Sequence, residues 1–199
     1  KMVYYNQDQN LLYILAGGKF YKIDLTKDEQ TVLAKNLEEG QYTVSADGHL
    51  IAYQTSGTIN TAQEIKVLNL KTDEENAVAA KSGEAIRPLG FIGSDFVYGY
   101  LRQEDVGHTA AGGELFPMYE LEIRNSENEV MKTYSADQIY ISDVFIEENM
   151  MTLNRVVKSG ETYTVTSQDY ISSNEEKKTK SITLEAFSTD LKEKQMRLT

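Results

Sequence analysis

The chain has 199 residues, of which 40% are hydrophobic and 26% are charged, a composition that supports a folded core. Its 31 acidic and 20 basic residues give a net charge of −11, which argues against a protein that binds nucleic acid or anionic membranes. Cysteine is absent, which excludes disulfides, thiolate chemistry and the common zinc-finger spacings. No apolar run approaches the roughly 18 residues of a membrane span, so no transmembrane segment is expected.

Short alternating apolar strings recur along the chain, and polar turns separate them. One family of strings covers residues 11–15, 49–53, 95–99 and 149–153. Each of these strings follows a turn, and another apolar string lies before that turn. This pattern predicts four hairpins of one design. Asp47-Gly48 is the most specific of these turns, and Gly17-Gly18 is interpreted as a further two-residue hairpin turn.

A second family of strings follows each hairpin, at residues 21–25, 65–70, 119–123 and 182–187. Strict alternation places Tyr21, Ile23 and Leu25 on one face and Lys22 and Asp24 on the other, which is typical of half-buried strands. A polar turn and a weaker apolar string complete each copy; in the last copy this string contains Met196 and Leu198. The sequence therefore predicts a repeated module of four strands.

The repeat spacing indicates the architecture. Tyr13, Tyr53, Tyr98 and Thr152 occupy equivalent positions, and modules of roughly 40 to 50 residues with four strands each are typical of propeller blades. We expect an all-β chain of four four-stranded β-propeller blades that belong to a larger ring, with boundaries at about 1–37, 38–83, 84–136 and 137–199. A helix over residues 184–198 is the alternative for the last segment.

Two segments resemble known families. Ser-Ala-Asp-Gly-His-Leu-Ile-Ala-Tyr at 45–53, followed by Ile-Lys-Val-Leu-Asn-Leu-Lys-Thr at 65–72, resembles the TolB-type blade pattern, which also occurs in the N-terminal propeller domains of dipeptidyl-peptidase-like proteins. Ala46 stands where that pattern has Pro, and Asp73 where it has Gly. Residues 140–174 resemble a stretch of propeller-like surface lipoproteins of Gram-positive bacteria. The resemblance implies a location at the bacterial cell surface or outside the cell, although the absence of cysteine also allows the cytoplasm.

No catalytic constellation is evident. Peptidases of the dipeptidyl-peptidase type carry their hydrolase machinery in a separate α/β domain, and this chain has no Gly-x-Ser-x-Gly elbow. His49 and His108 lie in different modules and lack metal-ligand spacing, while the acidic residues cluster in turns, where solvation explains them. We therefore expect no catalytic residue, no metal and no cofactor.

The strongest candidate for partner binding is the long insertion of the third module, residues 102–118. It exceeds what a hairpin needs, and long loops in compact domains are often functional or simply mobile. It supplies the candidate contact residues Arg102, Glu104, Asp105, His108 and Phe116; the alternative is a flexible surface loop. The fourth-module insertion is expected to add a hairpin built on Val156-Val157 and residues 163–165.

These observations favour a non-enzymatic, extracytoplasmic binding module whose blade-face loops contact a protein or glycan. Two alternatives remain open: a propeller-based hydrolase with a carboxylate site, and an accessory propeller that serves a catalytic domain outside this chain. The sequence does not identify the ligand or the oligomeric state.

Overall fold

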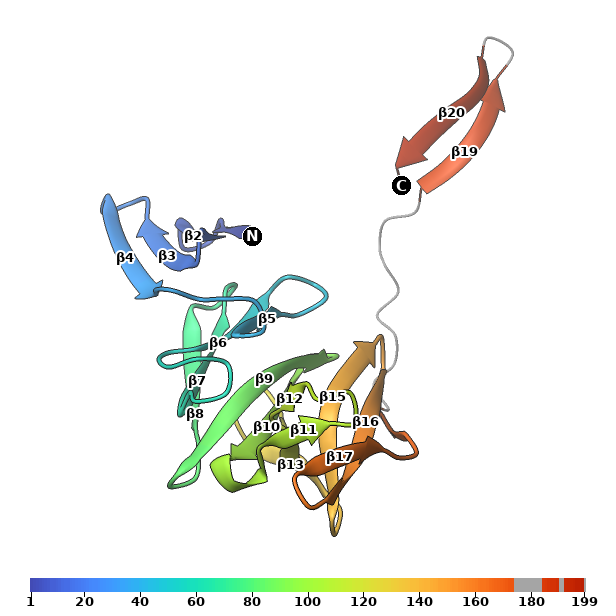
Figure 1. The fold of residues 1–199 in the computed structure, drawn as a ribbon. Helices are drawn as coiled ribbons and strands as arrows, with labels where there is room; N and C mark the ends of the chain where they lie inside the picture. The colour runs from blue at the N-terminus through green and yellow to red at the C-terminus, as the bar shows by residue number, and fades with distance from the viewer. Residues whose placement is uncertain (174–183, 190–191, 199) are drawn as a thin grey trace.

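The computed structural model describes residues 1–173, 184–189 and 192–198 (Figure 1). Nearly all regular structure in these residues is β-strand, and η1 (Gln103–Asp105), a single 3₁₀ turn, is their one helical element. The prediction of an all-β fold is therefore confirmed. Within the described part of the chain, no helix is long and apolar enough to cross a membrane.

Two four-stranded antiparallel sheets occupy the first 79 residues. Sheet 1 consists of β1 (Met2–Asn6), β2 (Leu11–Ala16), β3 (Lys19–Asp24) and β4 (Glu29–Ala34), paired in that order. Sheet 2 repeats the arrangement with β5 (Tyr42–Val44), β6 (Leu50–Gln54), β7 (Glu64–Asn69) and β8 (Glu74–Ala79).

The next strands along the chain keep the same plan but are interrupted by insertions. Sheet 3 consists of β9 (Glu84–Ile92), β10 (Asp95–Arg102), β13 (Met118–Arg124) and β14 (Val130–Ser135). Sheet 4 consists of β15 (Ile139–Glu147), β16 (Met150–Ser159) and β18 (Asp169–Ser172). One residue pair, Met118 with Ile141, links sheets 3 and 4 into a continuous hydrogen-bonded path.

Backbone conformation explains why the predicted turns form where they do. Gly17 and Gly18 join β2 to β3 with φ angles of +57° and +71°, the left-handed pair that a two-residue hairpin turn requires. Gly48, with a φ of +74°, makes the corresponding left-handed step between β5 and β6. The interpretation of both dipeptides as hairpin turns is therefore confirmed.

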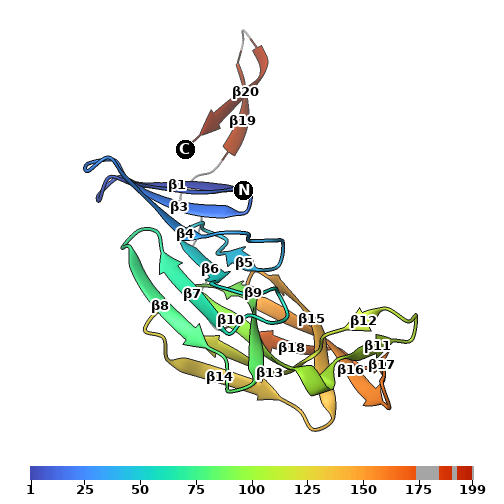
Figure 2. The same cartoon turned by 60° about the vertical axis from the view of Figure 1, so that its left-hand side comes forward.

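Apolar side chains join successive sheets face to face. One cluster packs Leu11, Tyr13 and Phe20 of sheet 1 against Ile51 and Tyr53 of sheet 2. A second cluster joins sheets 2 and 3, and a third joins sheets 3 and 4. Figures 1 and 2 show the resulting series, with sheet 1 at one end, β15, β16 and β18 at the other, and sheets 2 and 3 between them. Four-stranded meanders stacked face to face in this way are propeller-type blades.

Three buried tyrosines lie on the second strands of sheets 1 to 3: Tyr53 and Tyr98 each face the preceding sheet, whereas Tyr13 faces the following one. Tyr13, Tyr53 and Tyr98 have no exposed surface, and they are the residues that the sequence repeat aligns. Their hydroxyls donate hydrogen bonds to carboxylates at the sheet interfaces, namely Asp73, Glu75 and Glu122. A buried tyrosine hydroxyl needs such a partner, so each tyrosine fills the core with its ring and fixes a carboxylate with its hydroxyl.

The fourth module differs from its predicted form. The repeat predicts the string 182–187 beside the second strand, but Ile182 and Thr183 lie outside the described residues, and β19 (Leu184–Thr189) pairs with β20 (Lys192–Leu198) instead. The place beside β16 is taken by β18, whose Ile171 is buried opposite Met151. Strand β18 is closer to β16 along the chain than the string 182–187 is, and its register places Ile171 in the core. The helical alternative for residues 184–198 is wrong where the structure describes them.

Candidate ligand-binding cavity

The two long insertions of the chain come together in space. Residues 102–118 fold into η1 and the short strands β11 (Gly107–Thr109) and β12 (Glu114–Leu115), and the fourth-module insertion forms β17 (Thr162–Val165). Strand β11 pairs with β12 and, in parallel, with β17. The expected extra hairpin is present, since Val156 pairs with Val165 and Val157 with Thr164. The third-module insertion is therefore a folded extension that rests on the fourth module.

Asp105 fastens this extension. Its side chain is buried, its Oδ1 accepts a hydrogen bond of 3.0 Å from the Tyr140 hydroxyl, and its backbone carbonyl accepts one of 2.5 Å from the Tyr163 hydroxyl. Lys158 adds a hydrogen bond of 3.0 Å to the carbonyl of Glu104. Because these partners belong to the fourth module, Asp105 acts between modules and is not available to an outside partner.

A cavity of about 150 Å³ lies between the third-module insertion and the second-module loop 55–63. Arg87 joins its two sides: the guanidinium Nη2 donates to the side chain of Asn60 on the loop and, over 3.4 Å, to the carbonyl of Phe116 on the insertion. The polar and aromatic side chains of the lining are Asn60, Thr61, Gln63, Glu84, Arg102, Gln103 and Phe116.

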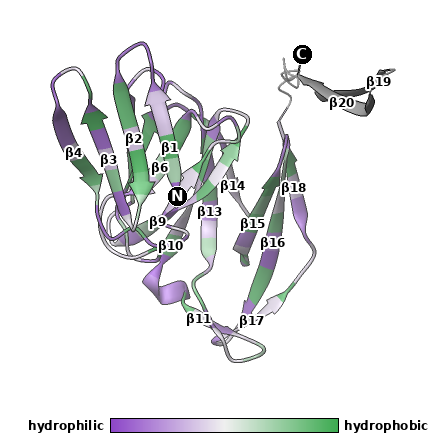
Figure 3. Cartoon of the chain, turned by 90° about the horizontal axis from the view of Figure 1, so that it is seen from above, coloured by the Kyte–Doolittle hydropathy of each residue, from purple (hydrophilic) through white to green (hydrophobic). Residues whose placement is uncertain are grey.

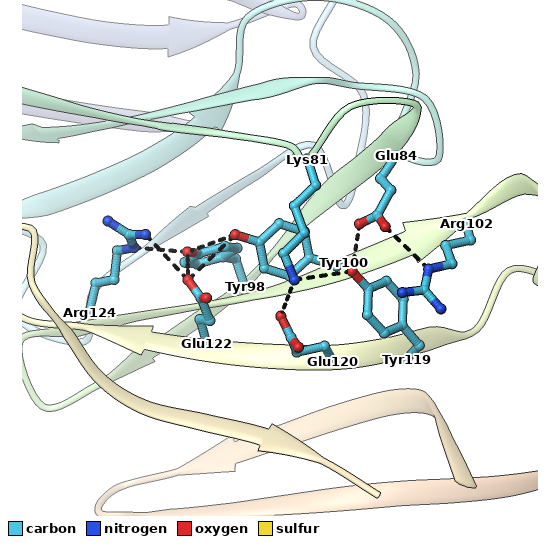
Figure 4. Close-up of polar contacts among 9 residues, drawn as sticks. All are labelled: Lys81, Glu84, Tyr98, Tyr100, Arg102, Tyr119, Glu120, Glu122 and Arg124. Carbon is cyan, nitrogen blue, oxygen red and sulfur yellow. Dashed lines mark hydrogen bonds and ion pairs between the residues drawn. The ribbon is translucent and has the colours of Figure 1, made fainter. Parts of the chain in front are cut away.

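A network of ions and tyrosine hydroxyls supports one wall of the cavity (Figure 4). Arg102 donates from Nε to Glu84 over 3.2 Å, and its guanidinium carbon lies 3.6 Å from the centre of the Tyr119 ring. Tyr119 donates to the other oxygen of Glu84 over 2.6 Å. Lys81 donates a hydrogen bond of 3.2 Å to the Tyr119 hydroxyl and one of 2.5 Å to Glu120. Glu84 and Arg102 therefore enter the cavity with their orientations fixed.

The inner end of the network lies where sheet 3 faces sheet 2; Tyr98 is fully buried there, and Glu122 and Arg124 are half-buried. Tyr98 donates to Glu122, and Arg124 donates from Nε to the Tyr98 hydroxyl over 2.8 Å. Arg124 also pairs with Glu122 at 3.3 Å. As Figure 4 shows, these contacts come from neighbouring positions of β10 and β13. The wall of the cavity is thus attached to the sheet core.

Burial and polar contacts shift the pKa values of three groups at the cavity. Burial raises the pKa of the Tyr119 hydroxyl, and its hydrogen bond to Glu84 raises that pKa further. Burial works to lower the pKa of Arg102, but the hydrogen bond and charge of Glu84 outweigh it, so this pKa is raised. Burial lowers the pKa of Arg87. At neutral pH the cavity therefore presents the fixed guanidinium of Arg102 and side-chain amides, while the phenol of Tyr119 behind this wall stays neutral.

The structure separates the five candidate contact residues predicted from the sequence. Arg102 and Phe116 line the cavity. Asp105 is buried, and Glu104 is exposed and contributes its backbone carbonyl to Lys158. His108 is exposed on β11, where its backbone pairs with Thr162. The structure thus brings two of the five together.

Other lining residues are not identified by the sequence patterns. Asn60 and Gln63 lie in the second-module loop, whose extra length between strands is the available signal. Glu84 is the first residue of β9, and no sequence pattern marks it as a site residue. Its role depends on contacts with Arg102 and Tyr119 on neighbouring strands.

A larger hollow of about 540 Å³ lies beside β3, β4 and the turn around Asp73. Lys22 pairs with Asp73 there, and Lys27 with Asp24 at 3.1 Å, but the lining has no aromatic ring and one side-chain amide, Gln9. Among the described residues, no three of His, Asp and Glu are grouped closely enough to hold a metal ion. The cavity beside Arg102 is therefore the better candidate site.

No protein-family model and no curated protein matches the chain. Solved structures resemble it at low identity. Oligopeptidase B from Trypanosoma brucei matches over 99% of this chain and 30% of its own, with 13% identity and a TM-score of 0.44. U3-55K matches over 82% of this chain and 50% of its own, with 11% identity and a TM-score of 0.40. A protein from Lactobacillus plantarum matches over 84% and 54%, with 10% identity and a TM-score of 0.34. The chain thus spans half or less of the first two proteins, and its fold assignment rests on the sheets described above.

Proposed function

We propose that the chain is a non-enzymatic binding module that contacts a protein or glycan through its insertion face and takes one polar group of that partner into the cavity beside Arg102. The observation that carries the proposal is the convergence of a fixed guanidinium, three side-chain amides and the Phe116 ring on one concave site. Arginine and aromatic residues are enriched at binding interfaces, and amides offer both donors and acceptors.

The size of the cavity limits what it takes. Pockets for drug-sized ligands usually span about 300 to 1,000 Å³, and this cavity has about 150 Å³. One sugar unit or one side chain of a larger partner suits that volume, while the surrounding insertion face contacts the rest. Location at a bacterial cell surface is part of the proposal, and the resemblance of residues 45–72 and 140–174 supports it.

The hydrolase alternative requires two carboxyl groups in one cleft. Among the described residues that line the cavity, Glu84 is the one carboxylate, and both of its oxygens are engaged, by Arg102 and by Tyr119. At this cavity, the arrangement favours binding over acid–base chemistry.

A glycan and peptide binding screen with matched variants tests the proposal. Arg102→Ala and Gln63→Ala remove lining groups, whereas Lys27→Ala removes a positive charge in the other hollow. We expect the cavity variants to weaken binding by about tenfold, or about 1.4 kcal/mol, and the control to bind like wild type. Unchanged binding by both cavity variants, or a loss confined to Lys27→Ala, would contradict the proposal.

A further inference from the structure

The face of sheet 1 that points away from sheet 2 carries apolar side chains in cross-strand rows. Register pairs Val3 with Ile14, Ile14 with Tyr21, and Tyr21 with Val32. A second row contains Tyr5, Leu12 and Ile23. Val3 is 71% exposed and Tyr5 50%, and Figure 3 shows hydrophobic stretches along these strands. No described sheet covers this face.

Sheet 4 has a corresponding open face. Its inner side presents Met151 and Leu153 to the core shared with sheet 3. Its outer side carries a row of Phe145, Thr152 and Tyr170. Phe145 is 60% exposed and Tyr170 57%.

These two faces continue an interface that the chain already uses three times. Sheet 2, for example, has Ile51 and Tyr53 packed against sheet 1 and Ala52 and Ile65 packed toward sheet 3. Interior sheets have both faces covered, whereas sheets 1 and 4 each have one open face. The two open faces therefore resemble the two sides of one further sheet-to-sheet contact.

Their charges are complementary. By strand alternation, the open face of sheet 1 carries Lys19, and Lys1 immediately precedes β1; the described strands place no acid there. The open face of sheet 4 carries Asp143 and Glu147, which alternate with Phe145, and Asp143 also acts electrostatically on Arg87. Lys158, at the far end of β16, bonds to the third-module insertion instead. Opposite charges on facing patches favour correct pairing and disfavour pairing of like faces.

We propose that a second copy of this chain docks head to tail, with sheet 4 of one copy on sheet 1 of the other, and that two such contacts close a ring. Each copy supplies four blades, and the closed pair stays within the range of about four to eight blades known for propellers. A heterologous contact of this kind closes into a ring when its rotation permits and otherwise extends into a filament.

Sedimentation velocity over a wide range of protein concentration tests the proposal. Wild type is expected to form a dimer. Val3→Glu places a charge on the open face of sheet 1, and Phe145→Glu places one on the open face of sheet 4. Both positions are more than half exposed, so each variant should fold, and each should remain monomeric. Met131→Glu, at a 61% exposed position in sheet 3, is the matched control and should dimerise like wild type.

Mixing the two variants distinguishes a head-to-tail contact from a symmetric one. In the mixture, the intact sheet 4 of Val3→Glu meets the intact sheet 1 of Phe145→Glu, so dimers should reappear, more weakly than in wild type. Thermal unfolding of each variant confirms its fold, and Tyr170→Glu serves as a second probe of sheet 4. A wild type that stays monomeric at every concentration, filaments of indefinite length, or a Phe145→Glu variant that dimerises like wild type would each overturn the proposal.

Discussion

Buried tyrosines paired with carboxylates are the recurring residue-scale feature of this molecule. Tyr98 shows the full arrangement, because its hydroxyl donates to Glu122 and accepts from Arg124 at the interface of sheets 2 and 3. Removing that hydroxyl leaves two charged groups without a shared partner in a poorly solvated place, which is costly.

Tyr98→Phe should therefore lower the free energy of unfolding by about 1 to 3 kcal/mol. Tyr170→Phe is the matched control, since its exposed hydroxyl bonds to Gln168 at 3.0 Å, and its effect should stay within about 0.5 kcal/mol. Urea unfolding followed by circular dichroism measures both. Equal effects of the two substitutions would show that the buried hydroxyl has no special role.

The same tyrosines predict a loss of stability in alkali. Burial raises the pKa of Tyr13, Tyr53 and Tyr98, and the adjacent carboxylates raise it further. Because the folded pKa lies above the unfolded value of about 10, the contribution of each tyrosine is complete below about pH 10 and declines as the pH rises through the folded pKa. The unfolded chain loses its phenolic protons first, so unfolding midpoints measured from about pH 8 to 11 should fall in the upper part of this window, and less steeply in Tyr98→Phe. A flat profile would contradict the assignment.

At the scale of elements, sequence patterning predicts strands well and their partners less well. The period of two predicts which residues of β2 are buried, and Gly17-Gly18 predicts a hairpin turn. Strands β6 and β10 are covered on both faces and are buried at consecutive positions. The parallel pairing of β11 with β17 joins residues more than 50 positions apart, and no local pattern encodes it. Asp105 illustrates the same limit, because a carboxylate in a polar loop gives no sign that two distant tyrosines will enclose it.

Gly107→Ala tests the contact between the two insertions. A Cβ at this position would lie 2.5 Å from the carbonyl oxygen of Glu161 and 2.8 Å from the Tyr163 ring. Such contacts are shorter than packed interiors tolerate, so β11 should separate from β17. Gly113→Ala is the matched control, with its nearest atom at 3.4 Å. Hydrogen exchange should show faster exchange of residues 107–109 in the first variant only; unchanged protection there would refute the role given to this contact.

At the scale of the whole molecule, the repeat and its alternation predict a series of blades, and the structure confirms the all-β architecture. The last blade shows where that prediction fails: the string 182–187 has the right composition, but β18 occupies the place beside β16. Of the candidate site, Arg102 and Phe116 could be predicted because they lie in an unusually long loop. Glu84, Asn60 and Gln63 could not, because packing between modules creates the cavity.

Amide chemical-shift mapping tests the central claim, that the cavity between the second-module loop 55–63 and the third-module insertion is the binding site. The titrant is the strongest glycan or peptide ligand from the screen, added to wild type and to Arg102→Ala. We predict shift changes concentrated in residues 58–63 and 102–106 of wild type, and their loss in the variant. Changes confined to residues 9–33, beside the other hollow, or changes that persist unaltered in Arg102→Ala, would contradict the claim.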